Sequence, residues 1–176
     1  MYALASRLLG LPVISLQTGE AVAVLQLPVV DPAALDLVAY RLESRHEDHL
    51  YVLMIRDIRQ MALDCVIIDS EEELVAADDI VRIQTLLEAN YSPIAKLVFT
   101  DLGRRLGVVE DYTINLETSQ IQKLYVKQAL WRSWFGASLI VDRTQIIDVT
   151  PKQIVVRDAT IREPLMAHKT APDIHP

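Results

Sequence analysis

An internal repeat constrains this chain more than any other feature of its sequence. With a shift of 84 positions in the 176-residue sequence, Gly19 aligns with Gly103 and the residues around both glycines agree in type. The other aligned pairs are Val13 with Leu97, Val22 with Leu106, Val24 with Val108, Leu25 with Val109, Asp31 with Asn115, Leu37 with Ile121, and Leu42 with Val126. After an insertion of four residues the shift becomes 88, and the apolar triplet at 66–68 aligns with that at 154–156. Because turn and polar positions match as well as apolar ones, the sequence predicts two copies of one unit, over about 6–75 and about 91–162.

Each copy is expected to consist of short β-strands separated by turns. In the second copy, the apolar pattern predicts strands at 96–100, 105–115, 121–127, 139–141, 146–149 and 153–157. The turn before the second of these strands contains Gly103, which can adopt a positive φ angle without steric cost. Five or six short strands cannot form a large open sheet, and closing them into a barrel removes exposed edges. We therefore expect a mainly β fold of two small β-barrels in tandem.

Between the copies, the spacing of apolar residues changes to that of a helix. Ile80, Ile83 and Leu87 recur at helical intervals, and we expect the aspartates at 78–79 to cap the N-terminus of this helix. Asn90 can end the helix in the left-handed conformation. The predicted organisation is a first barrel over 1–75, a linker helix over 76–90, a second barrel over 91–162 and a flexible tail over 163–176.

Charge is distributed unevenly between the two copies. Residues 1–90 contain 6 Lys/Arg and 15 Asp/Glu, a net charge of −9, whereas residues 91–176 contain 11 and 9, a net charge of +2. The total of −7 argues against DNA as a partner and disfavours RNA. The acidic half either attracts a basic partner or simply keeps the protein in solution, and the sequence leaves both readings open.

Localisation follows from the cysteine content and the hydropathy pattern. The single cysteine, Cys65, cannot form an internal disulfide, and we expect it to be a small buried apolar side chain. No run of apolar residues reaches the roughly 20 needed for a membrane helix. The apolar start of the chain lacks a basic region, so we expect neither a signal peptide nor membrane insertion. The sequence predicts a cytoplasmic protein.

The strand and glycine pattern resembles that of the PRC-barrel domain family. The stretch 96–127 (KLVFTDLGRRLGVVEDYTINLETSQIQKLYVK) is similar to the opening strands of such a domain, and 146–156 is similar to its closing strands. The first copy shows the same order around Gly19. The family includes the barrel of the photosynthetic reaction-centre H subunit and the C-terminal half of the ribosome maturation factor RimM. The resemblance implies protein binding or assembly and no shared catalytic residues, although this chain has neither a membrane helix nor a RimM-like N-terminal domain.

Two polar clusters are candidate metal sites, and in both the sequence argues against metal binding. The acidic run at 69–73 lacks the alternating oxygen ligands and turning glycine of a calcium loop. The pair His46 and His49 would need a third protein ligand to hold zinc. No phosphate-binding loop, nucleophile elbow or triad spacing is present. We expect no metal, no cofactor and no enzymatic activity.

The candidate partner-binding residues are Trp131, Arg132, Trp134 and Phe135. Both tryptophans of the chain lie in this segment, between two predicted strands of the second copy. Aromatic and arginine side chains are enriched at binding hot spots, whereas the alternative is that they pack within the barrel. Six cations in the same copy give it a basic surface: Lys96, Arg104, Arg105, Lys123, Lys127 and Arg132.

Three functions compete at this point. The first is a protein-binding adaptor or assembly factor, with a ribosomal or assembly protein as one candidate partner. The second is a peripheral component of an energy-transducing or envelope complex, and the third is a module that binds a small ligand or metal. The sequence leaves homo-oligomerisation open.

Overall fold

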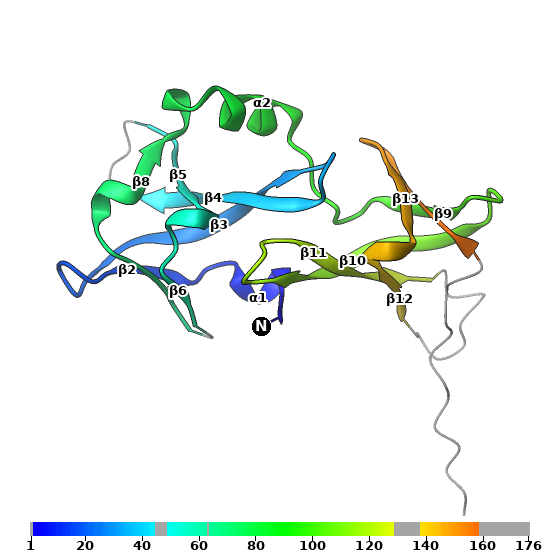
Figure 1. Ribbon diagram of the computed structural model, residues 1–176, viewed down its shortest axis with the longest axis horizontal. Helices are drawn as coiled ribbons and strands as arrows, with labels where there is room; N and C mark the ends of the chain where they lie inside the picture. The colour runs from blue at the N-terminus through cyan, green and yellow to red at the C-terminus, as the bar shows by residue number, and fades with distance from the viewer. Residues whose placement is uncertain (1, 45–48, 63, 129–137, 159–176) are drawn as a thin grey trace, which may run out of the picture.

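The computed structural model describes residues 2–44, 49–62, 64–128 and 138–158, and over these residues the protein is mainly β. The described strands form two sheets of seven strands each. The sheets lie next to one another along the long axis of the molecule, and Figure 1 shows the first on the left and the second on the right. None of the described helices is long and apolar enough to cross a membrane.

The first sheet has the strand order β6-β7-β2-β3-β4-β5-β8. Its strands are β2 (Pro12–Ser15), β3 (Ala21–Asp31), β4 (Asp36–Ser44), β5 (Tyr51–Met54), β6 (Gln60–Met61), β7 (Val66–Ile68) and β8 (Leu74–Ala76). Neighbouring strands are antiparallel except for β2 and β7, which are parallel.

The second sheet has the order β12-β11-β10-β9-β14-β13, with β1 added alongside β10. Its strands are β1 (Tyr2–Leu4), β9 (Leu97–Thr100), β10 (Arg105–Asn115), β11 (Ile121–Lys127), β12 (Ser138–Asp142), β13 (Ile146–Val149) and β14 (Gln153–Val156). Six strands of this sheet therefore correspond, one for one and in the same order, to six strands of the first. Here β9 and β14 are the parallel pair.

The first strand of each copy aligns with a shift of 85, not the 84 taken from the sequence. Val13 pairs with Val66, whereas Val98 pairs with Ile154, so Val98 and not Leu97 is the counterpart of Val13. The turn that follows is one residue shorter in the second copy, and this restores the shift of 84 at Gly19 and Gly103. Both glycines have positive φ angles, of 72° and 78°.

The long hairpins β3–β4 and β10–β11 carry the same irregularities. Register breaks in the first hairpin occur between Leu25 and Pro28 and between Val29 and Val30. Those in the second occur between Val109 and Asp111 and between Thr113 and Ile114, within one residue of the positions 84 later. Each hairpin tip contains a residue with positive φ, Leu35 in the first and Ser119 in the second. Shared bulges of this kind bend both hairpins in the same way.

The two hairpin tips bind one another reciprocally. The N–H of Leu37 donates to the carbonyl of Ser119 at 2.8 Å, and the N–H of Ile121 donates to the carbonyl of Leu35 at 3.0 Å. An isolated bridge between Asp36 and Gln120 lies between these bonds. Since each copy supplies the equivalent donor and acceptor, the halves are related by an approximate two-fold axis through this point.

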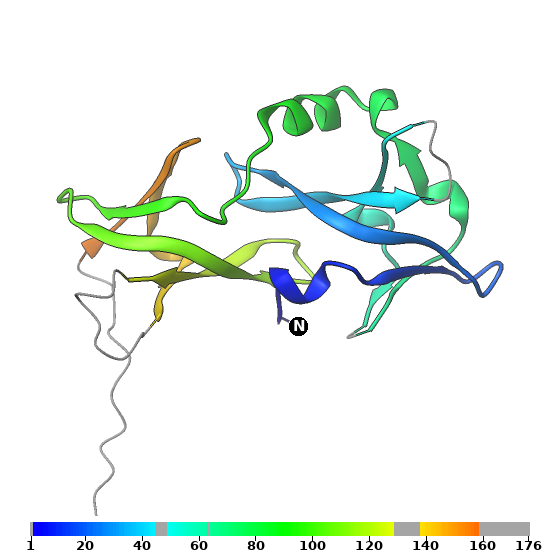
Figure 2. The ribbon, with the colours of Figure 1, turned by 180° about the vertical axis from the view of Figure 1, so that it is seen from behind.

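The second half is also covered by a segment that precedes the first half in the sequence. Strand β1 and helix α1 (Ala5–Leu8) lie before β2 in sequence, yet they pack on β10 of the second sheet. Figures 1 and 2 both place α1 where the two sheets meet. One continuous apolar core runs through both halves, from Val13 and Leu25 to Val109 and Ile154. A shared core suits halves of this size, because each half alone would bury a smaller fraction of its surface.

Helix α2 (Val81–Ala89) follows β8 and lies above the first sheet (Figure 1). Asn90 ends it with a φ angle of 43°, and its N–H donates to the carbonyls of Leu86 and Leu87. The expected N-terminal cap is wrong: Ile80 occupies that position without a side-chain bond, and the two aspartates lie in a separate 3₁₀ turn, η3 (Ala77–Asp79). The helix gains its stability from packing, because Ile83 is fully buried among apolar residues of the sheet.

The described strands of neither sheet close into a barrel, contrary to expectation. In the first sheet, β5 leads to β6 through the 3₁₀ turn η1 (Ile55–Asp57), and in the second, β12 leads to β13 through η4 (Arg143–Gln145). The second corner joins the two ends of its strand order covalently, whereas in the first sheet β8 lies beyond β5. No ladder pairs β5 with β6 or β12 with β13 over the described residues. The remaining 3₁₀ turn of the described residues, η2 (Glu71–Glu73), precedes β8.

Candidate interaction surface

The predicted aromatic site lies outside the described residues. Trp131, Arg132, Trp134 and Phe135 belong to the stretch 129–137, which connects β11 to β12. The two ends of this connection are fixed, because Lys127 and Ser138 are paired across the two strands. The candidate site is therefore tethered to the outermost described pair of strands in the second sheet.

Two clefts lie where the hairpin tip of one half meets the 3₁₀ corner of the other. The first has a volume of about 300 Å³ and is lined by 32–35, Arg143 and 146–149. The second has a volume of about 200 Å³ and is lined by Ile55, 58–61, Leu116 and Glu117. The residue numbers correspond under the repeat, so the clefts are two-fold counterparts. Their volumes lie at or below the lower end of the range for small-molecule pockets.

Arg143 distinguishes the two clefts. Its guanidinium donates from Nη1 to the carbonyl of Leu35 at 2.9 Å and to that of Ile121 at 3.2 Å, and from Nη2 to the carbonyl of Ala34. Nη2 also lies 3.4 Å from a carboxylate oxygen of Asp36. In the other cleft the equivalent residue is Ile55. Arg143 thus joins the second half to the hairpin tip of the first, and its donors are occupied by the protein itself.

Three buried tyrosines lie in the core between the halves. Tyr40 and Tyr112 are fully buried and Tyr91 is nearly so, and none of the three hydroxyls has a hydrogen-bond partner among the described residues. Burial raises the pKa of Tyr91 to about 12. Burial, followed by the proximity of Tyr112, raises the pKa of Tyr40 well above its ordinary value. Burial therefore keeps these hydroxyls protonated at neutral pH.

The basic residues predicted in the second half are mostly engaged by their own half. Lys96 donates to the carbonyl of Pro151 at 2.6 Å and lies 5.5 Å from the ring centroid of Tyr91. Arg104 forms an ion pair with Asp158, and Lys127 lies 3.6 Å from Glu110. A described cation that is already paired gains less from a phosphate, because the existing pair must first be broken.

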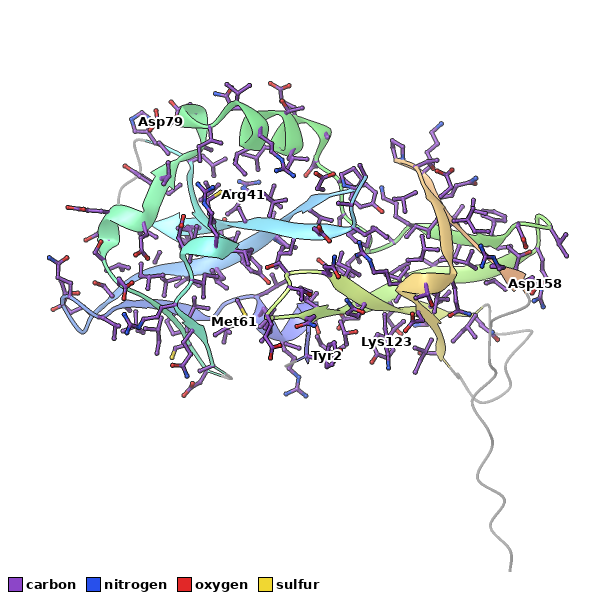
Figure 3. The ribbon with its side chains drawn as sticks, in the orientation of Figure 1. Tyr2, Arg41, Met61, Asp79, Lys123 and Asp158 are labelled. Carbon is purple, nitrogen blue, oxygen red and sulfur yellow. The ribbon has the colours of Figure 1, made fainter. Side chains whose placement is uncertain are left out.

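Lys123 lies on the outer face of the second sheet. Hydrogen bonds from the backbone and side chain of Thr144, and to a lesser extent the charge of Lys123, lower the pKa of Asp142, the residue paired with Lys123 across β11 and β12. Figure 3 shows Lys123 on the outside of this sheet and Arg41 on the α2 side of β4 in the first. In the repeat, Lys123 corresponds to Ala39, which is buried beneath α2. The outer face of the second half is therefore polar where that of the first is apolar.

The candidate metal ligands do not assemble over the described residues. Asp69 is paired with Arg59, and its backbone N–H donates to the carboxylate of Glu73 at 3.3 Å. His49 lies 3.8 Å from Asp78, whereas His46 lies outside the described residues. In the part of the chain that the structure describes, no three His, Cys, Asp or Glu side chains are arranged to hold a metal ion.

Cys65 differs from its expected environment. It is half-buried and directly precedes β7, so it is not the fully buried strand residue that the sequence predicts. Partial burial and the neighbouring Asp64 raise the pKa of its thiol. A raised pKa disfavours the reactive thiolate form.

Strand β12 is the most distinctive surface of the second half, and sequence reasoning missed it. It is an end strand of the described sheet, and Ile140 at its centre is 44% exposed. Its counterpart β5 is not an end strand, because β8 pairs with its other side. The signal in the sequence is the divergence between the copies: at the positions 88 residues after β8, Arg162-Glu163-Pro164 replaces Leu-Val-Ala.

No family model matches the chain, and no curated protein matches it.

Proposed function

We propose that the protein is a non-enzymatic adaptor that binds another protein through its second half. In this proposal the chain contains two barrel-like units of the PRC-barrel type, joined by α2. The shared strand order of the two sheets supports this assignment, since the resembling stretch 96–127 spans β9 to β11. Fold likeness alone identifies no partner, whereas the surfaces of the two halves differ in a way that does bear on binding.

The observation that carries the proposal is the asymmetry between the two halves. In the first half, β8 pairs with β5, and α2 packs over Val29, Ala39 and Val52. In the second half the equivalent positions are Thr113, Lys123 and Ile140, and Ile140 is exposed at an end strand. The first half is thus a support, and the second half presents an edge next to the connection that contains the tryptophans.

The partner we propose is a cytoplasmic protein in an assembly pathway, for example a ribosomal or assembly protein. A protein is favoured over nucleic acid because the chain carries a net charge of −7 and its described cations are largely paired. A membrane complex or a small ligand is then an outcome of the test, since no described feature favours either.

The test is capture of partners from native lysate at low salt by the tagged full-length protein, followed by mass spectrometry. The test variant is Trp131→Ala/Trp134→Ala. The matched control is Tyr2→Ala, which removes an aromatic side chain that is 64% exposed on β1.

The proposal predicts a defined set of cytoplasmic proteins that the double variant loses and the control keeps, with both variants folded. Capture of membrane proteins instead would indicate that the protein is a peripheral component of an envelope complex. If the wild-type protein captures nothing that the double variant loses, the adaptor function is refuted.

A further inference from the structure

The outer edge of β12 has a covered counterpart within the same molecule. Under the repeat, β12 corresponds to β5, and β8 pairs antiparallel with β5 through Tyr51 with Ala76, Val52 with Val75, and Leu53 with Leu74. The equivalent side of β12 has no partner strand among the described residues. The first half therefore shows what kind of segment such an edge accepts.

The backbone N–H and C=O of Ile140, at the centre of β12, point toward this outer edge. The N–H of Ala77 donates to the carbonyl of Leu50, so every second residue from Leu50 onwards, including Val52, points its N–H and C=O toward β8. Val52 corresponds to Ile140, and the pairing of β11 with β12 has the same register as that of β4 with β5. The N–H and C=O of Ile140 consequently point away from β11.

The chain does not repeat the β8 sequence at the corresponding position. Under the shift of 88, the Leu-Val-Ala of β8 corresponds to Arg162-Glu163-Pro164. Proline has no N–H to donate to a ladder, and two adjacent charged residues replace the apolar pair. The sequence at this position therefore lacks the features with which β8 satisfies the edge of β5.

We propose that the edge of β12 receives an extended segment of the partner protein as an added antiparallel strand. The segment has apolar residues at its centre and acidic residues before them, as β8 has Leu-Val-Ala preceded by Glu71–Glu73. The acidic flank suits a half that carries a net charge of +2 rather than the −9 of residues 1–90. Strand addition of this kind takes affinity from backbone hydrogen bonds and specificity from alternate side chains. The inference rests on the proposed adaptor function and specifies its surface.

The probe is a fluorescein-labelled peptide with the sequence of residues 70–78, which is the β8 segment itself. Its binding to the full-length protein is measured by fluorescence anisotropy. The test variant is Ile140→Pro, which removes the outward N–H. It should fold, because proline is tolerated in an edge strand whose N–H faces solvent. The matched control is Val81→Pro at the exposed first position of α2, where proline is favoured.

We expect saturable binding to the wild type and to Val81→Pro, weakened at least about tenfold in Ile140→Pro. If Ile140→Pro fails to fold, its N–H was bonded within the sheet and the assigned edge is wrong. A dimer that Ile140→Pro dissociates, seen by light scattering with no peptide binding, would replace the partner segment with a second copy of this chain. Equal affinity of all three proteins would also overturn the proposal.

The lysate experiment separates this inference from the proposed function. If Trp131→Ala/Trp134→Ala loses the partners but Ile140→Pro keeps them, the adaptor function stands and strand addition is wrong. If Trp131→Ala/Trp134→Ala loses no partner, the adaptor function itself fails, whatever the result for Ile140→Pro.

Discussion

Replacing Arg143 by Met tests whether one side chain ties the two halves together. The guanidinium donates to three carbonyls, two of them in the hairpin tip of the first half. Hydrogen bonds from charged groups contribute about 1.5–3 kcal/mol each when they are buried. The side chain is 27% exposed, so water replaces part of what is lost. We therefore expect Arg143→Met to reduce the free energy of unfolding by about 2–4 kcal/mol, less than the sum of three buried bonds.

The assay is thermal unfolding followed by circular dichroism, with urea denaturation in parallel. For a domain of 150–250 residues, a loss of about 2–4 kcal/mol lowers Tm by about 4–16 °C. The control is Arg56→Met, the same substitution at a neighbouring corner, where the side chain is 76% exposed and lies 3.6 Å from Asp57. We expect the control to cost less than about 1 kcal/mol.

A conservative variant sharpens the experiment. Arg143→Lys keeps the positive charge, but a single ammonium cannot reach several carbonyls in the fork geometry of a guanidinium. It should lose most of the stability that Arg143→Met loses. The reasoning is refuted if Arg143→Met and Arg56→Met have the same Tm, or if Arg143→Lys is as stable as the wild type.

Three further predictions concern single side chains. Gly107→Ala should destabilise by about 1–3 kcal/mol or more in urea denaturation, because the new Cβ would lie 2.2 Å from the backbone oxygen of Lys127; a wild-type midpoint would contradict that contact. Tyr40→Phe should keep or raise Tm at pH 7, since the hydroxyl of Tyr40 is buried without a partner among the described residues. The variant should also lose less stability above pH 10. There the unfolded wild type ionises Tyr40, whereas the raised pKa keeps the folded protein protonated. A large drop in Tm at pH 7 would show that the hydroxyl is bonded. Although partial burial opposes it, the hydrogen bond from Arg82 lowers the pKa of Asp31, so the stability lost in Asp31→Asn should be present at neutral pH and disappear as the pH falls below about 4. A stability difference that persists unchanged at pH 2 would disprove this ion pair as its cause.

The sequence predicts the long strands of the second half well. Strands β10 and β11 have the bounds expected from their apolar pattern, 105–115 and 121–127, and β13 lies at 146–149 as expected. Turn residues mark both ends of these strands, so their bounds can be read from the sequence although bulges interrupt the alternation in the β10–β11 hairpin. The paired glycines at 19 and 103 have the positive φ angles that their place in a turn requires.

Other features depend on contacts that local sequence does not encode. Strand β1 has only three residues and pairs with β10, more than 100 positions away, so no periodicity reveals it. The one-residue change of register between β2 and β9 is absorbed in a turn, where residue types align equally well with either shift. Arg143 is visible in the sequence only as a charge at the position of Ile55, and its role follows from a hairpin tip that the repeat alone does not place.

One part of the candidate site can be predicted from the sequence, and the other part cannot. Composition identifies the tryptophan-containing connection, because aromatic residues are rare in this chain. The edge of β12 is recognised only by comparing the two sheets, because β8 pairs with β5 but no described strand pairs with the equivalent side of β12. A sequence pattern predicts that a strand exists, whereas its position at the end of a sheet is set by the other strands.

The most direct test of the account is native-state hydrogen exchange by NMR at the amides of Val52 and Ile140. The two amides occupy equivalent positions, but Val52 is covered by β8 and Ile140 lies at the edge that we assign to the partner. We predict that in the protein alone Ile140 exchanges at least about 100-fold faster than Val52, and that the β8 peptide slows it. Equal protection of the two amides in the free monomer would mean that the edge of β12 is already satisfied, and would contradict the account.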